Sequence, residues 1–205
     1  MTLQALIIGG TSGIGSSCAN QLVDNDYKIS LLNSNQLDLN FPERIFDHDF
    51  SKFDLLLNCA GHSQGTYLGF LKNTWQNQLS QITVNYTSNL FLLKHYASSC
   101  SNGKYVWFST TLLDQARPYH SVYAGTKAGS KFAIDLIRDE ATHINVLEVK
   151  VGPTKTNFRY RNFEGARSHD EVNIMYDQDF ALDPDYVAAE TIAAIQQNQK
   201  YIHIK

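Results

Sequence analysis

A glycine-rich turn directly after an apolar run is the feature that most constrains the fold of this chain. The run spans residues 3–8, and glycines follow at positions 9, 10, 13 and 15 in the sequence GGTSGIG. Beyond the turn, apolar residues recur at helical spacing as far as Val23. A strand, a glycine turn and a helix in this order present backbone N–H groups and a helix N-terminus to a phosphate. The spacing G-x-x-x-G-x-G differs from the commoner G-x-G-x-x-G dinucleotide motif, and a plain strand-to-helix connection is the alternative.

The composition is that of an ordinary globular protein. The chain has 205 residues, of which 43% are hydrophobic and 18% charged, and this length predicts a single domain over residues 1–205. The net charge of −3 gives no support for nucleic acid or an anionic membrane as partner. Cys18, Cys59 and Cys100 are widely separated, which argues against a disulfide framework and a metal site. We find neither a signal-peptide pattern nor an apolar stretch of about 18 residues, so we expect a cytoplasmic protein.

Strand and helix patterns alternate along the rest of the chain. Strands are expected at 27–32, 53–61, 104–109, 144–151 and 201–204, and helices at 73–99, 121–138 and 183–197. This alternation predicts an α/β fold with a doubly wound parallel sheet covered on both faces, which makes three layers, α/β/α.

The connection after the second expected strand is unusually short. Asp38 and Leu39 come only a few residues after it, and residues 40–43 (NFPE) have the pattern of a helix start. A crossover between parallel strands needs about a dozen residues or more. We therefore expect the third strand to be vestigial or this edge of the sheet to be remodelled.

The end of the second strand carries information on the nucleotide, because this position contacts the adenosine ribose in dinucleotide-binding folds. An acidic residue there favours NAD, whereas a basic one favours NADP. Here Asn33, Ser34 and Asn35 are all neutral. The missing acid removes repulsion against a 2′-phosphate, although no arginine replaces it. We expect NADP(H) in preference to NAD(H), with NAD as the alternative.

Residues 154–180 are polar and rich in aromatic side chains, with weak periodicity. This pattern predicts a long loop or lid over a substrate site. Arg159, Arg161 and Arg167 lie within it. They could clamp an acidic substrate, or they could simply solvate the loop.

Tyr123 and Lys127 are four residues apart within an expected helix, so their side chains share one face. A lysine ammonium beside a phenol favours the phenolate and lowers its pKa from about 10. Such a tyrosine can donate or accept a proton near neutral pH. Alone, the pattern favours a surface pair.

Five motifs occur in one order along the chain: Gly9-x-x-x-Gly13-Ile14-Gly15, Asn58-Cys59-Ala60-Gly61, Val84-Asn85, Ser109-Thr110 and Tyr123-x-x-x-Lys127. Together they resemble the short-chain dehydrogenase/reductase family, in its single-domain form with a shortened region after the second strand. The resemblance covers residues 3–204. It implies a Rossmann-like sheet and an NADP- or NAD-dependent oxidoreductase that passes hydride between nicotinamide and a carbonyl or alcohol substrate. It also implies a homodimer or homotetramer packed through the long helices.

The resemblance assigns roles to individual residues. Tyr123 would be the general acid/base, Lys127 would bind the nicotinamide ribose and lower the pKa of Tyr123, and Asn85 would hold a water in a proton relay. The family's substrate-binding hydroxyl falls on Thr110, with Ser109 as the alternative. The expected catalytic residues are thus Asn85, Thr110, Tyr123 and Lys127. The expected cofactor-binding residues are Gly9, Thr11, Ser12, Gly13, Ile14, Gly15, Asn33, Ser34, Asp38, Leu39, Asn58, Ala60, Gly61, Tyr123, Lys127, Gly152, Thr154 and Thr156.

Two positions depart from the family pattern. Cys59 replaces the second asparagine of the Asn-Asn-Ala-Gly turn, and Val151 replaces a proline after the sixth strand. The shortened edge and the threonine at the hydroxyl position leave a second hypothesis, a dinucleotide-binding regulator or scaffold without turnover. A sugar-nucleotide epimerase of the extended type is disfavoured, because only about fifty residues follow Thr156.

Overall fold

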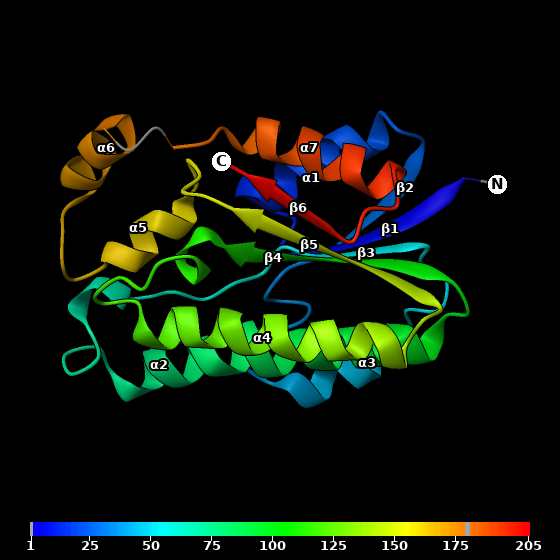
Figure 1. The fold of residues 1–205 in the computed structure, drawn as a ribbon, viewed down its shortest axis with the longest axis horizontal. Coiled ribbons are helices and arrows are strands. Elements are labelled where there is room, and N and C mark those ends of the chain that lie inside the picture. The colour runs from blue at the N-terminus through cyan, green and yellow to red at the C-terminus, as the bar shows by residue number, and fades with distance from the viewer. Residues whose placement is uncertain (1, 179–180) are drawn as a thin grey trace.

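A computed structural model describes residues 2–178 and 181–205 of the chain (Figure 1). Its centre is a six-stranded, wholly parallel sheet with the strand order β2-β1-β3-β4-β5-β6. The strands are β1 (Leu3–Ile8), β2 (Tyr27–Leu32), β3 (Leu55–Asn58), β4 (Gly103–Thr110), β5 (Ile144–Val151) and β6 (Tyr201–Ile204). The expected α/β fold with a doubly wound parallel sheet is confirmed.

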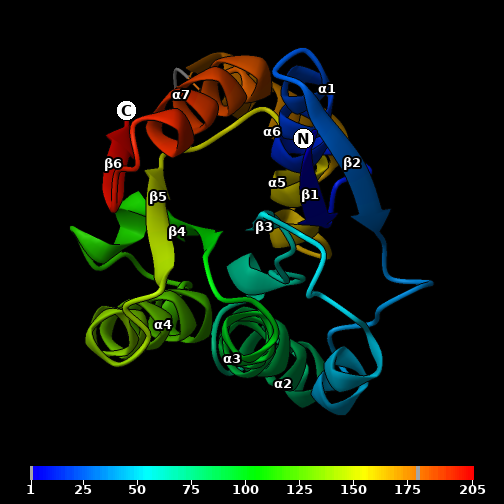
Figure 2. The same cartoon turned by 90° about the vertical axis from the view of Figure 1, so that its right-hand side faces the viewer.

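Helices cover both faces of the sheet, so the fold has three layers (Figure 2). α1 and α7 lie on one face, and α3 and α4 lie on the other. The helices are α1 (Gly13–Val23), α2 (Trp75–Ile82), α3 (Ser88–Ser99), α4 (Ser121–Glu140), α5 (Asn157–Phe163), α6 (His169–Gln178) and α7 (Pro184–Gln196).

Each face of the sheet has its own hydrophobic core, because successive side chains of a strand point to opposite sides. On β1, Ala5 and Ile7 pack with Leu22 of α1 and Val187 of α7. The intervening Leu6 joins the second core, which includes the side chains Leu92, Leu93, Tyr96 and Ile134 of α3 and α4. Burial on both faces explains why the strand sequences read as nearly continuous apolar runs.

The shortened edge has no strand of its own between β2 and β3. β2 is the outermost strand, and residues 33–41 pass through turns into a 3₁₀ helix, Pro42–Asp47. Leu37 and Leu39 in this stretch are buried in the core, together with Ile45 of the 3₁₀ helix. The third strand is therefore missing, as the short connection suggested, and a loop with buried leucines closes the edge instead.

The expected long helix 73–99 is interrupted at its middle. α2 leads into a π-helical turn, Thr83–Thr87, which leads into α3. A π turn leaves backbone groups outside the regular helical pattern and often lies at a functional site. The carbonyl of Asn85, inside the turn, accepts a hydrogen bond from Ser130 Oγ of α4 at 2.9 Å.

Residues 157–163 and 169–178 form the helices α5 and α6, so the expected long loop is wrong for this part. Residues 179–180 lie outside the described residues. α5 and α6 share a small core around Phe163 and Val172. The Phe163 ring stacks on Tyr67 with centroids 3.8 Å apart, and Gly65 N donates to the Arg161 carbonyl at 2.9 Å. We call residues 157–178 the cap. The hydrophobic periodicity of the cap is weak because its core is small and includes Tyr67, which lies in another segment of the chain.

In the described part of the chain, no helix combines the length and the apolar character needed to cross a membrane. Within the same residues, no cluster of three or more His, Cys, Asp and Glu side chains could hold a metal ion.

Candidate active site

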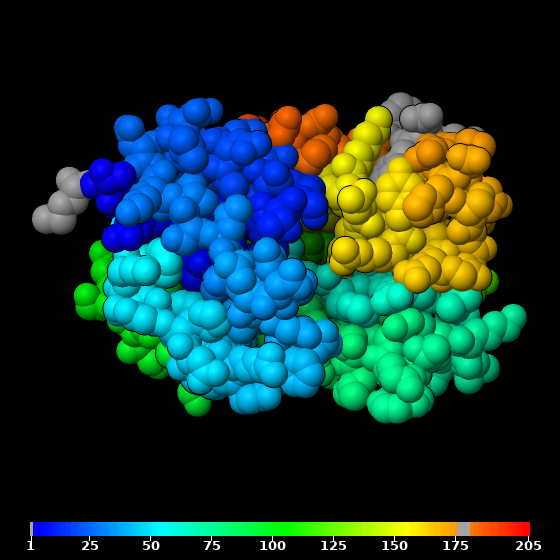
Figure 3. All heavy atoms as spheres, turned by 180° about the vertical axis from the view of Figure 1, so that it is seen from behind, coloured from blue at the N-terminus to red at the C-terminus, as the bar shows by residue number. Residues whose placement is uncertain are grey.

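A cavity of about 680 Å³ opens at the carboxyl ends of the parallel strands. In Figure 3 the molecule is hollowed between the blue N-terminal segments and the yellow α5. One end of the cavity is lined by the glycine turn and by the residues that follow β2; the other is lined by the end of β4, by α4 and by the cap. Strand ends at a point where the chain order reverses are where open α/β sheets bind ligands.

The glycine turn is built for close backbone approach. Gly9 and Gly13 have φ values of +76° and +54°, which glycine adopts without strain. A Cβ on Gly9 would lie 2.8 Å from the Ala60 nitrogen, and one on Gly13 would lie 2.9 Å from Thr156 Cγ2. The glycines therefore bring the turn against the 58–61 loop and against the start of α5.

The N-terminus of α1 faces the cavity with the backbone N–H groups of its first turn. Ser12, its N-cap, makes no capping hydrogen bond with its side chain, and the first turn of α1 has no acidic residue. Ser12, Gly13, Ile14 and Gly15 all line the cavity. Uncapped N–H groups at the positive end of a helix dipole bind phosphate. This end of the cavity thus fits the diphosphate of a dinucleotide.

Asn58 and Asn85 do not line the cavity but lie behind its wall. Asn58 Nδ2 donates to Asn89 Oδ1 at 2.9 Å, and Asn58 Oδ1 accepts from the Ala60 nitrogen. Asn85 accepts from the His62 nitrogen with Oδ1 at 2.8 Å and donates to the His62 carbonyl with Nδ2 at 2.7 Å. Both asparagines fix the backbone of the loop after β3.

The two hydroxyl candidates at the end of β4 have different hydrogen-bond partners. Ser109 lines the cavity too, but it is buried and its hydroxyl donates to Glu148 Oε1 at 2.6 Å. Thr110 lines the cavity and forms a side-chain hydrogen bond with Tyr123. Its Oγ1 also accepts a hydrogen bond from the Leu112 nitrogen at 3.3 Å. Of the two hydroxyls, the one on Thr110 is bonded to Tyr123 and the one on Ser109 to Glu148.

Tyr123 and Lys127 both line the cavity from α4, but Lys127 does not lower the pKa of the phenol here. Burial raises the pKa of Tyr123, and the hydrogen bond with Thr110 offsets this only in part. Lys127 Nζ donates to the Phe108 carbonyl at 2.8 Å, and burial lowers the pKa of Lys127 to about 8. The expected direction for Tyr123 is therefore reversed, because desolvation of the phenol outweighs its hydrogen bond with Thr110.

The segment after β5 is held in an extended form across the cavity. Val151 pairs with Thr110 and Ile204 in the sheet, so a valine continues the strand where a proline would lack the N–H. Beyond it, Leu182 N donates to the Pro153 carbonyl and Lys155 N donates to the Leu182 carbonyl. Gly152, Thr154 and Thr156 line the cavity.

Cys59 points into the core between the sheet and α1. It packs beside Cys18, with which it shares a side-chain hydrogen bond, and its Cβ lies against the position that a Cβ on Gly15 would occupy, at 3.0 Å. A small side chain meets the packing requirement there, which accounts for cysteine in place of asparagine. Cys18, Cys59 and Cys100 are all free thiols.

At the adenosine end, Asn33, Ser34, Asp38 and Leu39 all line the cavity. Asn33 Oδ1 accepts from the Asn35 nitrogen, and Asp38 Oδ1 accepts from the backbone and side chain of Asn40. These turns fix the loop after β2 without a third strand. Asn35 is not among the lining residues.

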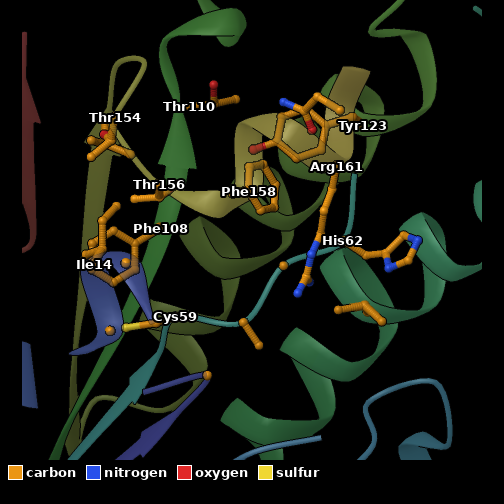
Figure 4. A pocket seen from close by; sticks show the side chains of 18 of the residues that line it. Ile14, Cys59, His62, Phe108, Thr110, Tyr123, Thr154, Thr156, Phe158 and Arg161 are labelled. Carbon is orange, nitrogen blue, oxygen red and sulfur yellow. The ribbon is translucent and has the colours of Figure 1, made fainter. Parts of the chain in front are cut away.

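Several lining residues near Tyr123 were not singled out from the sequence as site residues. They are His62, Tyr67, Arg117, His120 and Phe158. The rings of Phe158 and Tyr123 have centroids 5.9 Å apart, and Figure 4 shows Phe158 between Tyr123 and Thr156. The one available signal was position, since His62 directly follows Gly61 and Phe158 comes two residues after Thr156.

Comparison with known proteins agrees with this geometry. The family model described as short chain dehydrogenase matches residues 43–166, which is more than half of the chain. Among solved structures, a small-chain dehydrogenase in complex with NADPH is similar at 19% identity and a TM-score of 0.86, over 100% of this chain and 97% of that chain. No curated protein matches the sequence.

Two further solved structures share the fold. A short chain dehydrogenase from Burkholderia cenocepacia in complex with NADP is 15% identical, with a TM-score of 0.79 over 100% of this chain and 88% of that one. One from Sphingobium yanoikuyae in complex with NADPH is 18% identical, with a TM-score of 0.73 over 98% and 87%. At these identities the structures establish the fold, and the family model establishes the membership. The chain belongs to the short chain dehydrogenase family.

Proposed function

We propose that the protein is an NAD(P)-dependent oxidoreductase that transfers hydride between nicotinamide and a carbonyl or alcohol substrate, acting as a single domain over residues 1–205. One observation carries the proposal. Tyr123, hydrogen-bonded to Thr110, lines the same cavity as the glycine turn and the uncapped N-terminus of α1. A proton-transfer group and a diphosphate site thus face one space.

The chain's residues divide the work of binding. The N–H groups of residues 12–15 would hold the diphosphate, and Ser34 and Asp38 would face the adenosine. Lys127 would bind the nicotinamide ribose, and Thr156 would lie beside the nicotinamide. When bound, the cofactor supplies or accepts the hydride.

Tyr123 would transfer the proton to or from the substrate oxygen. Because burial raises its pKa, the phenol is protonated at neutral pH, which suits it to act as the acid in carbonyl reduction. Thr110 would donate a hydrogen bond to the same oxygen and so orient it. Asn85 would act through the backbone of His62, as a positioning residue. A water held by Asn85 in a proton relay remains part of the proposal.

NADP(H) is the cofactor that we propose in preference to NAD(H). The loop after β2 offers Asn33 and Ser34 to the cavity, with no acidic side chain at the strand end. Three solved structures of the same fold are described as complexes with NADPH or NADP. The three free thiols fit a reducing cytoplasmic setting.

The proposed assembly is a homodimer or a homotetramer. Phe132 and Leu136 are 71% and 53% exposed and lie four residues apart on α4, so they share one face. Two such faces can pack against each other across a two-fold axis.

A titration with NADPH and NADH, followed by nicotinamide fluorescence, tests the cofactor proposal, and a panel of ketones and aldehydes tests turnover. We expect tighter binding of NADPH and carbonyl-dependent oxidation of it. Tyr123→Phe is expected to abolish turnover while changing the dissociation constant of NADPH by no more than a few-fold. Retained activity in this variant would contradict the proposed role of Tyr123.

Two further outcomes separate the alternatives. Binding of NADPH without oxidation by any carbonyl compound would favour a dinucleotide-binding regulator. Failure to bind either nucleotide would refute the proposed function.

A further inference from the structure

We propose that Arg161 and His62 form an anion-binding subsite in the cavity, which takes a carboxylate or phosphate group of a bound ligand. The subsite deepens the proposed function and rests on it. The anion has two possible sources, the phosphates of the dinucleotide and an acidic group on the carbonyl substrate. Both offer the paired oxygens that a guanidinium binds in a bidentate manner.

Arg161 differs from the other arginines of the cap. Arg167 lies outside the cavity, 3.9 Å from Glu171. Arg159 lines the cavity, but its guanidinium lies over the Phe163 ring. Arg161 lines the cavity, and its guanidinium forms no ion pair or hydrogen bond with the residues that the structure describes. Figure 4 shows its side chain running from α5 into the cavity beside His62.

The backbone of Arg161 is held in place, which distinguishes it from an arginine on a solvated loop. Its carbonyl accepts a hydrogen bond from Gly65, and Phe163, two residues on, is 1% exposed and stacked on Tyr67. The cap is therefore fixed to the segment that follows His62. A fixed backbone directs the guanidinium over the cavity at a small entropic cost on binding.

His62 is held just as firmly. The Asn85 amide bonds both its N–H and its carbonyl. Among the described residues its Nε2 has no hydrogen-bond partner, although the atom is buried. Burial and the nearby charge of Arg161 lower the pKa of His62, so its ring is neutral at neutral pH. A buried polar atom without a partner is a group that a ligand can satisfy.

Cationic side chains outnumber acidic ones along the cavity, with Arg117, Lys127, Arg159 and Arg161 against Asp38 and Asp114. Of the two acids that line it, Asp114 is paired with Lys150, and Asp38 accepts hydrogen bonds from Asn40. Arg117 also lines the cavity. Arg161 therefore has no carboxylate partner of its own there, and an anionic ligand would supply one.

The test compares wild type, Arg161→Gln and the matched control Arg167→Gln by calorimetric titration. The first two probes are NADPH and inorganic pyrophosphate. The third and fourth are acetoacetate and its uncharged methyl ester, each added to protein saturated with NADP⁺. Removing a charged partner predicts about tenfold weaker binding of the anion that Arg161 contacts.

If NADPH and pyrophosphate bind more weakly to Arg161→Gln but not to Arg167→Gln, the anion bound by the subsite is a phosphate of the dinucleotide. Unchanged NADPH binding with weaker binding of acetoacetate, but not of the ester, assigns it to the substrate. If Arg161→Gln and wild type bind NADPH, pyrophosphate and acetoacetate with equal affinity, the proposed subsite is overturned. The same conclusion follows if neither protein binds these anions. If wild type binds no dinucleotide, the proposed function fails, and the pyrophosphate titration still decides on the subsite.

Discussion

The Asn85 side-chain amide forms two hydrogen bonds with the backbone of His62. Its Oδ1 accepts from the His62 N–H at 2.8 Å, and its Nδ2 donates to the His62 carbonyl at 2.7 Å. Asn85 lies in the π-helical turn between α2 and α3, and Ser130 of α4 donates to its carbonyl. One residue thus links the loop that lines the cavity with the helix that carries Tyr123 and Lys127.

Asn85→Asp is therefore expected to be harmful despite its similar shape. A carboxylate cannot donate to the His62 carbonyl, and the loss of a buried hydrogen bond costs about 1–3 kcal/mol. Urea denaturation should show this loss in the free energy of unfolding. Asn85→Ala, which loses both bonds, should be at least as unstable. A variant as stable as wild type would show that the Asn85–His62 hydrogen bonds do not stabilise the loop.

Thr110 and Ser109 should differ sharply when each is replaced by alanine. Thr110→Ala is expected to lower kcat by about a hundredfold, because it removes the donor to the substrate oxygen, while Thr110→Ser retains most activity. Ser109→Ala removes the buried hydrogen bond to Glu148. It should lower the melting temperature and leave kcat largely intact. The reverse pattern would assign the substrate contact to Ser109.

The stability of the protein should rise with pH between 8 and 10 because of Lys127. Its pKa in the folded state is about 8, whereas an unfolded lysine titrates near 10.4. In this range the unfolded chain binds the proton that the folded chain has lost, so the free energy of unfolding increases, by about 2 kcal/mol. Lys127→Met should lack this rise.

Comparison of the two pH profiles isolates the contribution of Lys127. The raised pKa of Tyr123 acts in the opposite direction above pH 10, because the folded chain then keeps a proton that the unfolded chain loses. Denaturation curves at several pH values below 10 avoid this overlap. Identical slopes for wild type and Lys127→Met would show that Lys127 titrates normally.

Gly13→Ala should disturb the glycine turn by two separable effects. The positive φ of Gly13 costs an alanine about 1–2 kcal/mol, and the added Cβ meets Thr156 Cγ2 at 2.9 Å. Thr156→Ser removes that methyl group. We expect it to restore part of the stability lost in Gly13→Ala, leaving the backbone cost, in a double-mutant cycle followed by thermal unfolding. Strict additivity of the two changes would exclude the steric contact.

Phe132→Asp should dissociate the proposed oligomer. A charge in the centre of a packed apolar helix face removes burial and leaves an unpaired carboxylate. Light scattering after size exclusion should give the mass of a monomer for the variant and a multiple of it for wild type. Because Phe132 is 71% exposed in the single chain, the monomer itself should fold normally. A monomeric wild type would contradict the proposal.

The sequence by itself determined the sheet, the glycine turn, the missing third strand and the spacing of Tyr123 and Lys127. These features depend on local periodicity, on glycine's backbone freedom and on the minimum length of a crossover, all of which are visible in a short window. The order of the motifs was enough to indicate the family.

Only the tertiary structure decided which candidates face the cavity. Thr110 and Ser109 both line it, but the Ser109 hydroxyl is bonded to Glu148, whereas the Thr110 hydroxyl is bonded to Tyr123. Asn58 and Asn85 lie behind the wall, because their amides bond backbone groups from other segments. The cap folds because Phe163 finds Tyr67, nearly a hundred residues away. The pKa of Tyr123 rises because burial depends on everything packed around it. Such long-range contacts leave no periodic signal in the sequence.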